Sequence, residues 1–241
     1  DAAWFEPLTM LAAIAGATAR VRLATGILIA PLRPAALLAK QAATLDQISG
    51  GRLDLGVGTG WQREEYEAEG LDFERRGRLL TDTIAACKVL WRDTPADFDS
   101  PTLSFREIYC VPKPLQPGGV PLWIAGTLNR RNLERLVLHG DGWIPIMGES
   151  VEGIAAGAAQ IRDAFAAAGR DANLLQVQGP LRLQKGDDGR FDIARSMESV
   201  PELVAAGATD VNTNLRAFCS DPDEAPTVMA EIAGRFREVA G

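Results

Sequence analysis

The sequence has few of the residues from which metal centres, disulfide frameworks and catalytic triads are built. It contains 3 cysteines and 1 histidine in 241 residues. Cys87, Cys110 and Cys219 stand at long, irregular spacings without a C-x-x-C pair, so we expect free thiols and neither a zinc site nor disulfides. A triad of the Ser-His-Asp or Cys-His type has to use His139, the only imidazole in the chain.

The sequence also lacks long apolar runs and an excess of basic residues. No apolar stretch approaches the ~20 residues of a membrane-spanning helix, and the first residues do not read as a signal peptide. Lys and Arg number 25 against 32 Asp and Glu, which gives a net charge of −7. There is no basic stripe of the kind that binds nucleic-acid phosphates. We therefore expect a cytoplasmic protein that binds neither membranes nor nucleic acids.

What the sequence does contain is a regular alternation of apolar strands and helices. The apolar runs are typical of parallel strands that are covered on both faces by helices. The expected strands are residues 21–30, 52–57, 121–126, 142–146, 174–183 and 209–215. The expected helices are residues 7–16, 34–49, 79–91, 129–139, 151–168, 201–206 and 224–239.

Two α/β architectures agree with this alternation in a single domain over residues 1–241. One is an open, doubly wound sheet; the other is a (β/α)₈ barrel, which typically has about 250 residues and eight strands. The six expected strands are two short of a barrel. Residues 93–119 form an irregular, proline-rich insertion with a possible hairpin over residues 98–109. Asp46 and Arg52 flank a glycine cap at Gly50 and Gly51, and we expect them to pair across it.

Several motifs occur in an order that resembles one known family. They are Ala39–Asp46, Ser49–Leu53, Leu55–Trp61, Pro112–Gln116, Pro121–Gly126 and Gly140–Pro145. Together they resemble the bacterial-luciferase-like flavin-dependent oxidoreductases, and most of all the coenzyme F420-dependent branch. This resemblance implies a TIM (β/α)₈ barrel, here apparently without its first two strands, which agrees with Asp rather than Met at position 1. It also implies a homodimer.

The resemblance places a cofactor ring against the first strand of this chain. Gly26 and Ile27 match the family position of a non-proline cis peptide that backs the flavin or deazaflavin ring. Glycine suits such a position because it has no Cβ atom. The alternative is that Gly26 only permits close packing inside the barrel.

Two further loops are implied in cofactor binding. Gly58, Thr59 and Gly60 follow a strand but fail the G-x-G-x-x-G pattern of dinucleotide-binding folds. The resemblance implies that their backbone amides approach the edge of the cofactor ring. The alternative is that these glycines only form a tight turn. Ala125, Gly126, Thr127, Leu128 and Asn129 lead into a helix N-terminus that suits a phosphate. Arg130 and Arg131 add positive charge, or are solvated residues behind an Asn129 cap.

The substrate side is less clearly marked. Trp61, Glu64 and Tyr66 follow the glycine loop and are expected to face the substrate, although Trp61 could equally be core. Sugar-phosphate dehydrogenases of the family carry an acidic residue at the position of Trp61, so their proton-transfer role does not carry over. Glu64 or Glu65 could replace it, or could instead interact with a helix N-terminus. His139 reads as structural, and no catalytic residue is assigned.

The predicted function is hydride transfer between F420 and a small organic substrate. The alternatives are an FMN-dependent luciferase-like monooxygenase and a non-catalytic flavin-binding barrel, since folds can outlast their activities. A Rossmann-type dehydrogenase would require a 3-2-1-4-5-6 strand order.

Overall fold

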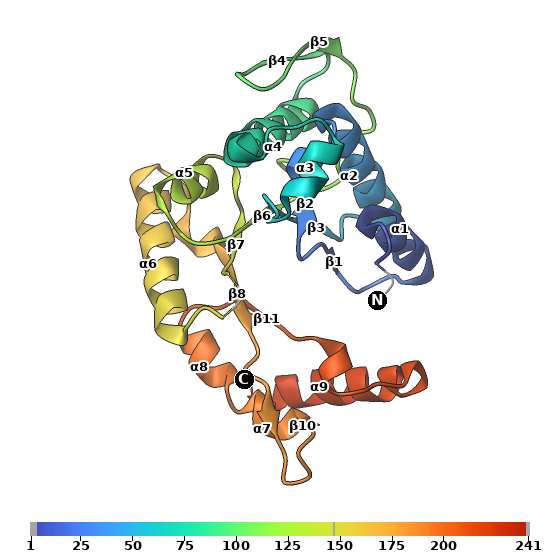
Figure 1. The fold of residues 1–241 in the computed structure, drawn as a ribbon, viewed down its shortest axis with the longest axis vertical. Coiled ribbons are helices and arrows are strands. Elements are labelled where there is room, and N and C mark those ends of the chain that lie inside the picture. The colour runs from blue at the N-terminus through green and yellow to red at the C-terminus, as the bar shows by residue number, and fades with distance from the viewer. Residues whose placement is uncertain (1–3, 147, 240–241) are drawn as a thin grey trace. The chain divides into compact units, whose positions relative to one another are not determined.

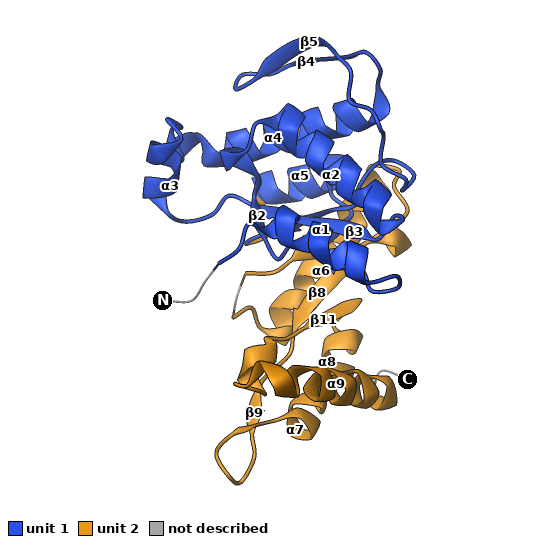
Figure 2. Ribbon diagram, turned by 90° about the vertical axis from the view of Figure 1, so that its right-hand side faces the viewer, with its two compact units in different colours: residues 1–126, 130–142 blue, residues 127–129, 143–241 orange. Residues whose placement is uncertain are grey.

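A computed structural model describes residues 4–146 and 148–239. The chain divides into two compact units (Figure 2). Unit 1 extends to Gly126 and also includes Arg130–Gly142, and unit 2 consists of Thr127–Asn129 and Trp143–Gly241.

Unit 1 is built on short parallel strands around one central strand, β3 (Leu53–Gly58). Both β1 (Leu23–Ala24) and β2 (Leu28–Ile29) pair with one side of β3, and β6 (Leu122–Ala125) pairs with the other. Every residue of β3 is buried, as the apolar run predicts for a strand between two layers.

The helices of unit 1 pack on one another beside these strands (Figure 1). Helix α2 contacts both α1 and α4, and the Trp91 indole N–H donates a hydrogen bond of 2.9 Å to the Ala39 carbonyl across the second of these contacts. The helices are α1 (Pro7–Ala17), α2 (Ala35–Ser49), α3 (Arg63–Ala68), α4 (Arg76–Arg92) and α5 (Arg130–His139).

Local sequence signals set the ends of two of these helices. Glu6 caps α1, where its carboxylate accepts from the Leu8 and Thr9 amides, and Pro7 takes the first helical position. Helix α2 ends at Gly50, which has a left-handed φ of 70°.

The expected pair between Asp46 and Arg52 is wrong. Asp46 instead accepts hydrogen bonds from the amides of Leu115 and Gln116 at 2.7 and 3.2 Å. Arg52 donates to main-chain carbonyls near the end of α1 and α2, including Ser49 at 2.5 Å. Both residues have a structural role, but the hydrogen bonds of each are made to backbone groups that sequence spacing does not predict.

Unit 2 contains the remaining parallel strands and four helices. The strand order is β7 (Gly142–Ile144), β8 (Gln176–Pro180) and β11 (Asp210–Asn212), with β8 and β11 parallel. Leu181, Met197 and Val200 form a buried cluster. The helices are α6 (Val151–Ala167), α7 (Ile193–Met197), α8 (Val200–Ala205) and α9 (Ala225–Val239). A small hairpin joins β9 (Gln184–Lys185) to β10 (Phe191–Asp192).

All six expected strands occur, but the first is broken into β1 and β2 at Thr25–Ile27. The hairpin within the proline-rich segment is confirmed: β4 (Ala96–Asp99) pairs antiparallel with β5 (Ser104–Ile108). In unit 1 the order β1-β3-β6 follows the chain without the reversal of a Rossmann sheet, so that alternative is wrong.

Two features of the described residues bear on the expected function classes. Within residues 4–146 and 148–239, no helix is long and apolar enough to cross a membrane. In the same ranges, no three His, Cys, Asp or Glu side chains gather as a metal site requires. Cys87, Cys110 and Cys219 are free thiols, as predicted.

Candidate functional site

The break in the first strand has the backbone geometry that the resemblance predicts. The peptide bond between Gly26 and Ile27 is cis. Just before it, the buried Thr25 hydroxyl donates a hydrogen bond of 2.7 Å to the Gly56 carbonyl, which ties this segment to β3. A Cβ atom built on Gly26 meets no atom within 4 Å. Among the described residues, close packing therefore does not explain this glycine.

Gly26 and Ile27 lie on the wall of a cavity of about 870 Å³ in unit 1. Its volume is within the range of sites that hold drug-sized ligands. The lining is mostly apolar, and its polar side chains are Thr25, Arg33, Gln41 and Glu65. The wall continues on α1, α2 and the chain before α1, at residues such as Trp4, Phe5, Met10, Leu11 and Leu37.

Three of the predicted cofactor-binding positions lie together beside this wall. A Cβ atom on Gly58 would lie 2.8 Å from Ile27 Cδ1 and 3.6 Å from Ala125 Cβ. Gly58 is therefore in contact with the segment that carries Gly26, and with the end of β6. The residues present fit a planar ring at Gly26, where the cavity wall carries no side chain.

Thr59 and Gly60 form the turn after β3. Gly60 has a φ of +66°, and its surroundings are filled by Ile29, whose Cδ1 would lie 2.8 Å from a Cβ atom. The Thr59 hydroxyl lies 3.2 Å from the Gly60 carbonyl. Gly60 therefore forms a tight turn, and the approach of the loop amides to a cofactor ring stays a prediction.

Tyr66 does not face a substrate. It is fully buried in α3, with its ring edge-on to Phe73 at 5.5 Å, and its hydroxyl donates a hydrogen bond to the Thr59 carbonyl. Burial raises the pKa of Tyr66 to about 12. The expectation of a pocket residue is therefore corrected: Tyr66 supports the glycine loop from behind, because α3 folds back onto the loop that precedes it.

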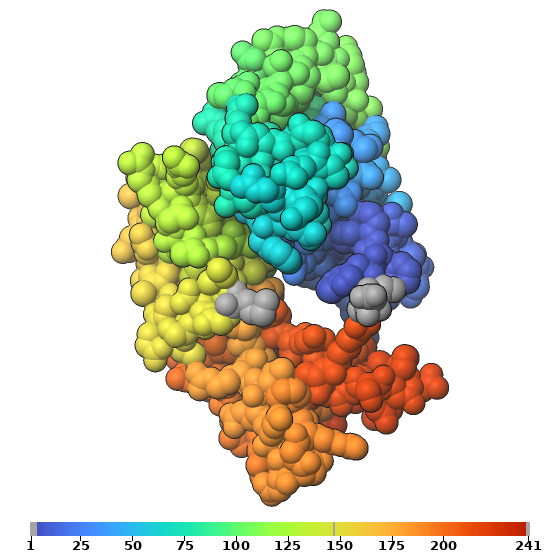
Figure 3. All heavy atoms as spheres, viewed as in Figure 1, coloured from blue at the N-terminus to red at the C-terminus, as the bar shows by residue number. Residues whose placement is uncertain are grey.

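The other predicted substrate residues differ in their exposure and in whether they line the cavity. Trp61 is 85% exposed, so the core alternative for it is wrong, and Figure 3 shows the segment after β3 on the surface of unit 1. Glu64 is exposed in the first turn of α3, where a carboxylate favours the positive end of the helix. Glu65, half-buried, lines the cavity instead.

The predicted phosphate loop follows β6. Ala125 and Gly126 belong to unit 1, and Gly126 has a φ of +115°. Thr127, Leu128 and Asn129 cluster with unit 2 and form a turn in which the Asn129 amide donates 2.9 Å to the Thr127 carbonyl. The structure thus brings together Gly26, Ile27, Gly58 and Ala125 within one unit.

The two arginines that follow this loop differ in their surroundings. Arg130 pairs with Glu134 one turn later at 2.9 Å and is exposed, which is the solvated arrangement. Arg131 is exposed as well. Its like charge helps to lower the pKa of Arg135.

Two polar features escaped prediction. The Trp123 indole N–H, in β6, is buried without a hydrogen-bond partner in the described chain. Asn132 and Arg135 are buried on α5. Their spacing of three, next to buried Leu136, is a signal that could have placed them on the inner face of the helix.

Comparisons with known proteins agree with this geometry. A family model described as luciferase-like monooxygenase matches residues 1–188. An uncharacterised protein of Mycobacterium tuberculosis is 32% identical over 171 residues, which are 69% of this chain and 58% of that protein. An FMNH₂-dependent dimethylsulfone monooxygenase of Pseudomonas putida is 34% identical over 167 residues, which are 68% of this chain and 45% of that enzyme. The chain thus spans about half the length of these relatives.

The structure is also similar to that of a coenzyme F420-dependent tetrahydromethanopterin reductase from Methanopyrus kandleri. The TM-score is 0.76, over 96% of this chain and 88% of the reductase, at 15% sequence identity. At this identity the similarity shows the fold alone: an α/β fold of the luciferase-like type, which corresponds to part of a (β/α)₈ barrel.

Proposed function

The chain belongs to the luciferase-like monooxygenase family, and on that premise we propose that it is an oxidoreductase that binds a flavin-type cofactor against Gly26 and Ile27. The observation that carries this proposal is the open space at Gly26, on the wall of a cavity of about 870 Å³. A position without a side chain beside a largely apolar cavity suits the flat face of a ring system.

Each predicted binding residue has a part in this proposal. Gly26 and Ile27 back the ring, and Gly58 to Gly60 approach its edge through backbone that Tyr66 supports from behind. Within unit 1, the Ala125–Gly126 turn and the positive end of the α5 helix dipole hold the phosphate. The part of Thr127, Leu128 and Asn129 in phosphate binding stays a prediction from the family resemblance.

The bound cofactor supplies the hydride chemistry, as is general for nicotinamide, flavin and deazaflavin enzymes. The residues of this chain bind and orient it, and the apolar lining excludes water from the ring. Glu65 is the acidic side chain on the cavity wall, and we assign it to contact with a small organic substrate.

The cofactor that we propose is F420, in hydride transfer to or from that substrate. The motifs between Ala39 and Pro145, which most resemble the F420-dependent branch of the family, support this choice. An FMN-dependent monooxygenase is the second candidate, which the dimethylsulfone monooxygenase relative favours.

Fluorescence titration of the purified chain with F420 and with FMN tests the proposal. We expect saturable binding of one of them, and loss of that binding in Gly26→Ala, because the added methyl group occupies the space assigned to the ring. Gly16→Ala is the matched control, since Gly16 in α1 is equally open but lies outside the cavity lining.

The outcomes separate the candidates. Binding of F420 with none of FMN supports the first candidate, and the reverse supports the second. Binding without turnover on any reducible substrate would identify a non-catalytic barrel. If neither cofactor binds, or if Gly26→Ala binds as the wild type does, the proposal fails.

A further inference from the structure

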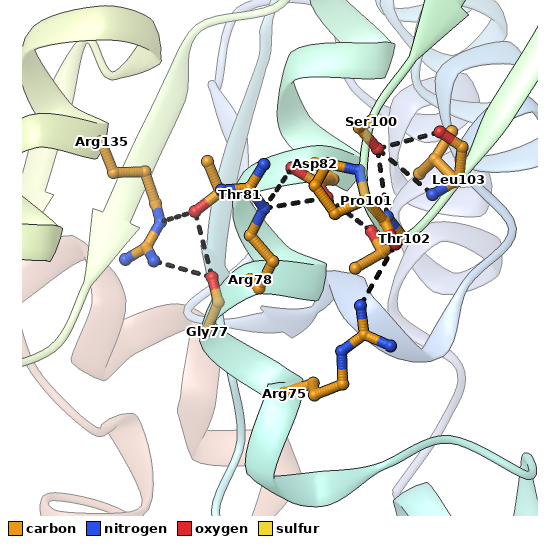
Figure 4. Close-up of polar contacts among 10 residues, drawn as sticks. All are labelled: Arg75, Gly77, Arg78, Thr81, Asp82, Ser100, Pro101, Thr102, Leu103 and Arg135. Atoms are coloured by element: carbon orange, nitrogen blue, oxygen red, sulfur yellow. Dashed lines mark hydrogen bonds and ion pairs between the residues drawn. The ribbon is translucent and has the colours of Figure 1, made fainter.

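Arg135 is a buried cation whose hydrogen-bond partners among the described residues are all neutral. Its side chain, in α5, is 7% exposed. Its guanidinium donates to the Thr81 hydroxyl at 3.0 Å and to the Gly77 carbonyl at 2.8 Å, both in α4 (Figure 4), and to Asn132 Oδ1 at 2.7 Å. Because burying a charge without an opposite charge costs free energy, a role beyond packing is expected for this residue.

The carboxylate of α4, Asp82, is engaged elsewhere. Asp82 accepts from Arg78 at 3.2 Å and from the Thr102 hydroxyl at 2.7 Å, on the other side of Thr81 in Figure 4. Burial lowers the pKa of the Arg135 guanidinium from its ordinary value, and the like charge of Arg131 lowers it further. The positive charge of Arg135 is therefore balanced by hydrogen bonds rather than by an acid.

Asn132 connects Arg135 to the end of β6 through two hydrogen bonds. Its Oδ1 accepts from Arg135, and its Nδ2 donates to the Ala125 carbonyl at 3.3 Å. Since a guanidinium only donates, the amide oxygen has to face Arg135, which directs the NH₂ group to Ala125. The next residue is Gly126, where a Cβ atom would lie 3.7 Å from that same Nδ2.

From these contacts we propose that Arg135 is a positioning residue for the cofactor phosphate. Through Asn132 it fixes the Ala125–Gly126 turn, and its buried charge adds to the positive potential at the start of α5. The inference rests on the proposed function, in which this turn holds a phosphate. It concerns the phosphoryl group that F420 and FMN share.

The test compares each cofactor with its phosphate-free counterpart, FMN with riboflavin and F420 with its deazaflavin chromophore. In Arg135→Gln the Kd of the phosphorylated form is expected to rise about tenfold, and that of the phosphate-free form by less than about twofold. Arg135→Lys keeps the charge without the fork of donors, and should recover part of the loss.

Asn132→Asp tests the connection from Arg135 through Asn132 to Ala125, with almost no change in the shape of the side chain. The new carboxylate pairs with Arg135 and removes the donor to Ala125, so phosphate selectivity should fall by about tenfold as well. This variant keeps the inference testable if Arg135→Gln does not fold. Arg92→Gln, at the exposed end of α4 where Arg92 pairs with Asp93, removes one charge elsewhere and should change neither Kd.

Equal losses for the phosphorylated and phosphate-free forms would show that Arg135 is merely structural and would overturn the inference. Unchanged selectivity in Asn132→Asp would do the same. In either case wild-type binding leaves the proposed function standing. A wild-type chain that binds neither FMN nor F420 overturns both.

Discussion

Ile29 fills the space beside Gly60, with its Cδ1 atom 2.8 Å from the position that a Cβ atom would take. Gly60 also has a φ of +66°, in the left-handed region that disfavours other residues. Two separate costs therefore apply to a side chain at this position, one from the backbone and one from the contact.

Gly60→Ala should lower the free energy of unfolding by more than the ~1–2 kcal/mol of left-handed backbone alone. Gly70→Ala is the matched control, because Gly70 has a φ of +67° but nothing within 4 Å of a Cβ atom. Urea unfolding of both variants measures the difference, which reports the contact with Ile29. Equal destabilisation would show that Ile29 moves aside freely.

Tyr66→Phe should destabilise the chain by about 1–3 kcal/mol, since the half-buried carbonyl of Thr59 loses its donor. The other tyrosine, Tyr109, is 67% exposed, so Tyr109→Phe should leave stability within about 0.5 kcal/mol. Thermal or urea unfolding of the two variants checks this prediction. A Tyr66→Phe variant as stable as Tyr109→Phe would contradict the role of Tyr66 as the support of the glycine loop.

Glu6 should make stability depend on pH in the acid range. Burial acts to raise its pKa, but hydrogen bonds from Thr9 and Leu8 and the charge of Arg33 outweigh burial and lower the pKa from 4.5 to about 2. The ionised Glu6 carboxylate therefore makes its full contribution to the free energy of unfolding above pH 4.5, and this contribution is lost as the pH falls towards 2. Glu6→Gln should destabilise at pH 7 by about 1 kcal/mol, as the loss of a helix cap does.

The difference in stability between the wild type and Glu6→Gln should shrink as the pH falls through this window. Unfolding curves at a series of pH values measure it. A difference that stays constant from pH 7 down to pH 2.5 would mean that the carboxylate charge contributes nothing.

The three cysteines should differ in reactivity. Burial raises the pKa of the Cys87 thiol to about 12 and also raises that of Cys110, and a thiol reacts as its thiolate. Cys219 is the half-exposed one. Titration with a thiol-specific disulfide reagent at pH 8 should label Cys219 in the folded chain and all three thiols after denaturation. Rapid labelling of Cys87 in the folded chain would contradict its burial.

The sequence by itself determined the order and type of the main elements. The run of β3, apolar except for Asp54, and the helices between the strands predict a parallel α/β fold, because parallel strands are buried on both faces. Gly50 predicts the end of α2, since a left-handed residue there requires no tertiary partner. The site at Gly26 and Ile27 was found by resemblance to a family, and its cis peptide is confirmed.

Only the tertiary structure decided which side chains meet. Asp46 finds its donors in Leu115 and Gln116, about seventy residues away, and Arg135 reaches across to Gly77 and Thr81 on α4. The burial of Tyr66 likewise depends on the fold of the segment after β3. Hydrophobic periodicity predicts which face of a helix or strand is buried. The hydrogen-bond partner of a buried polar group is instead determined by packing between distant segments of the chain.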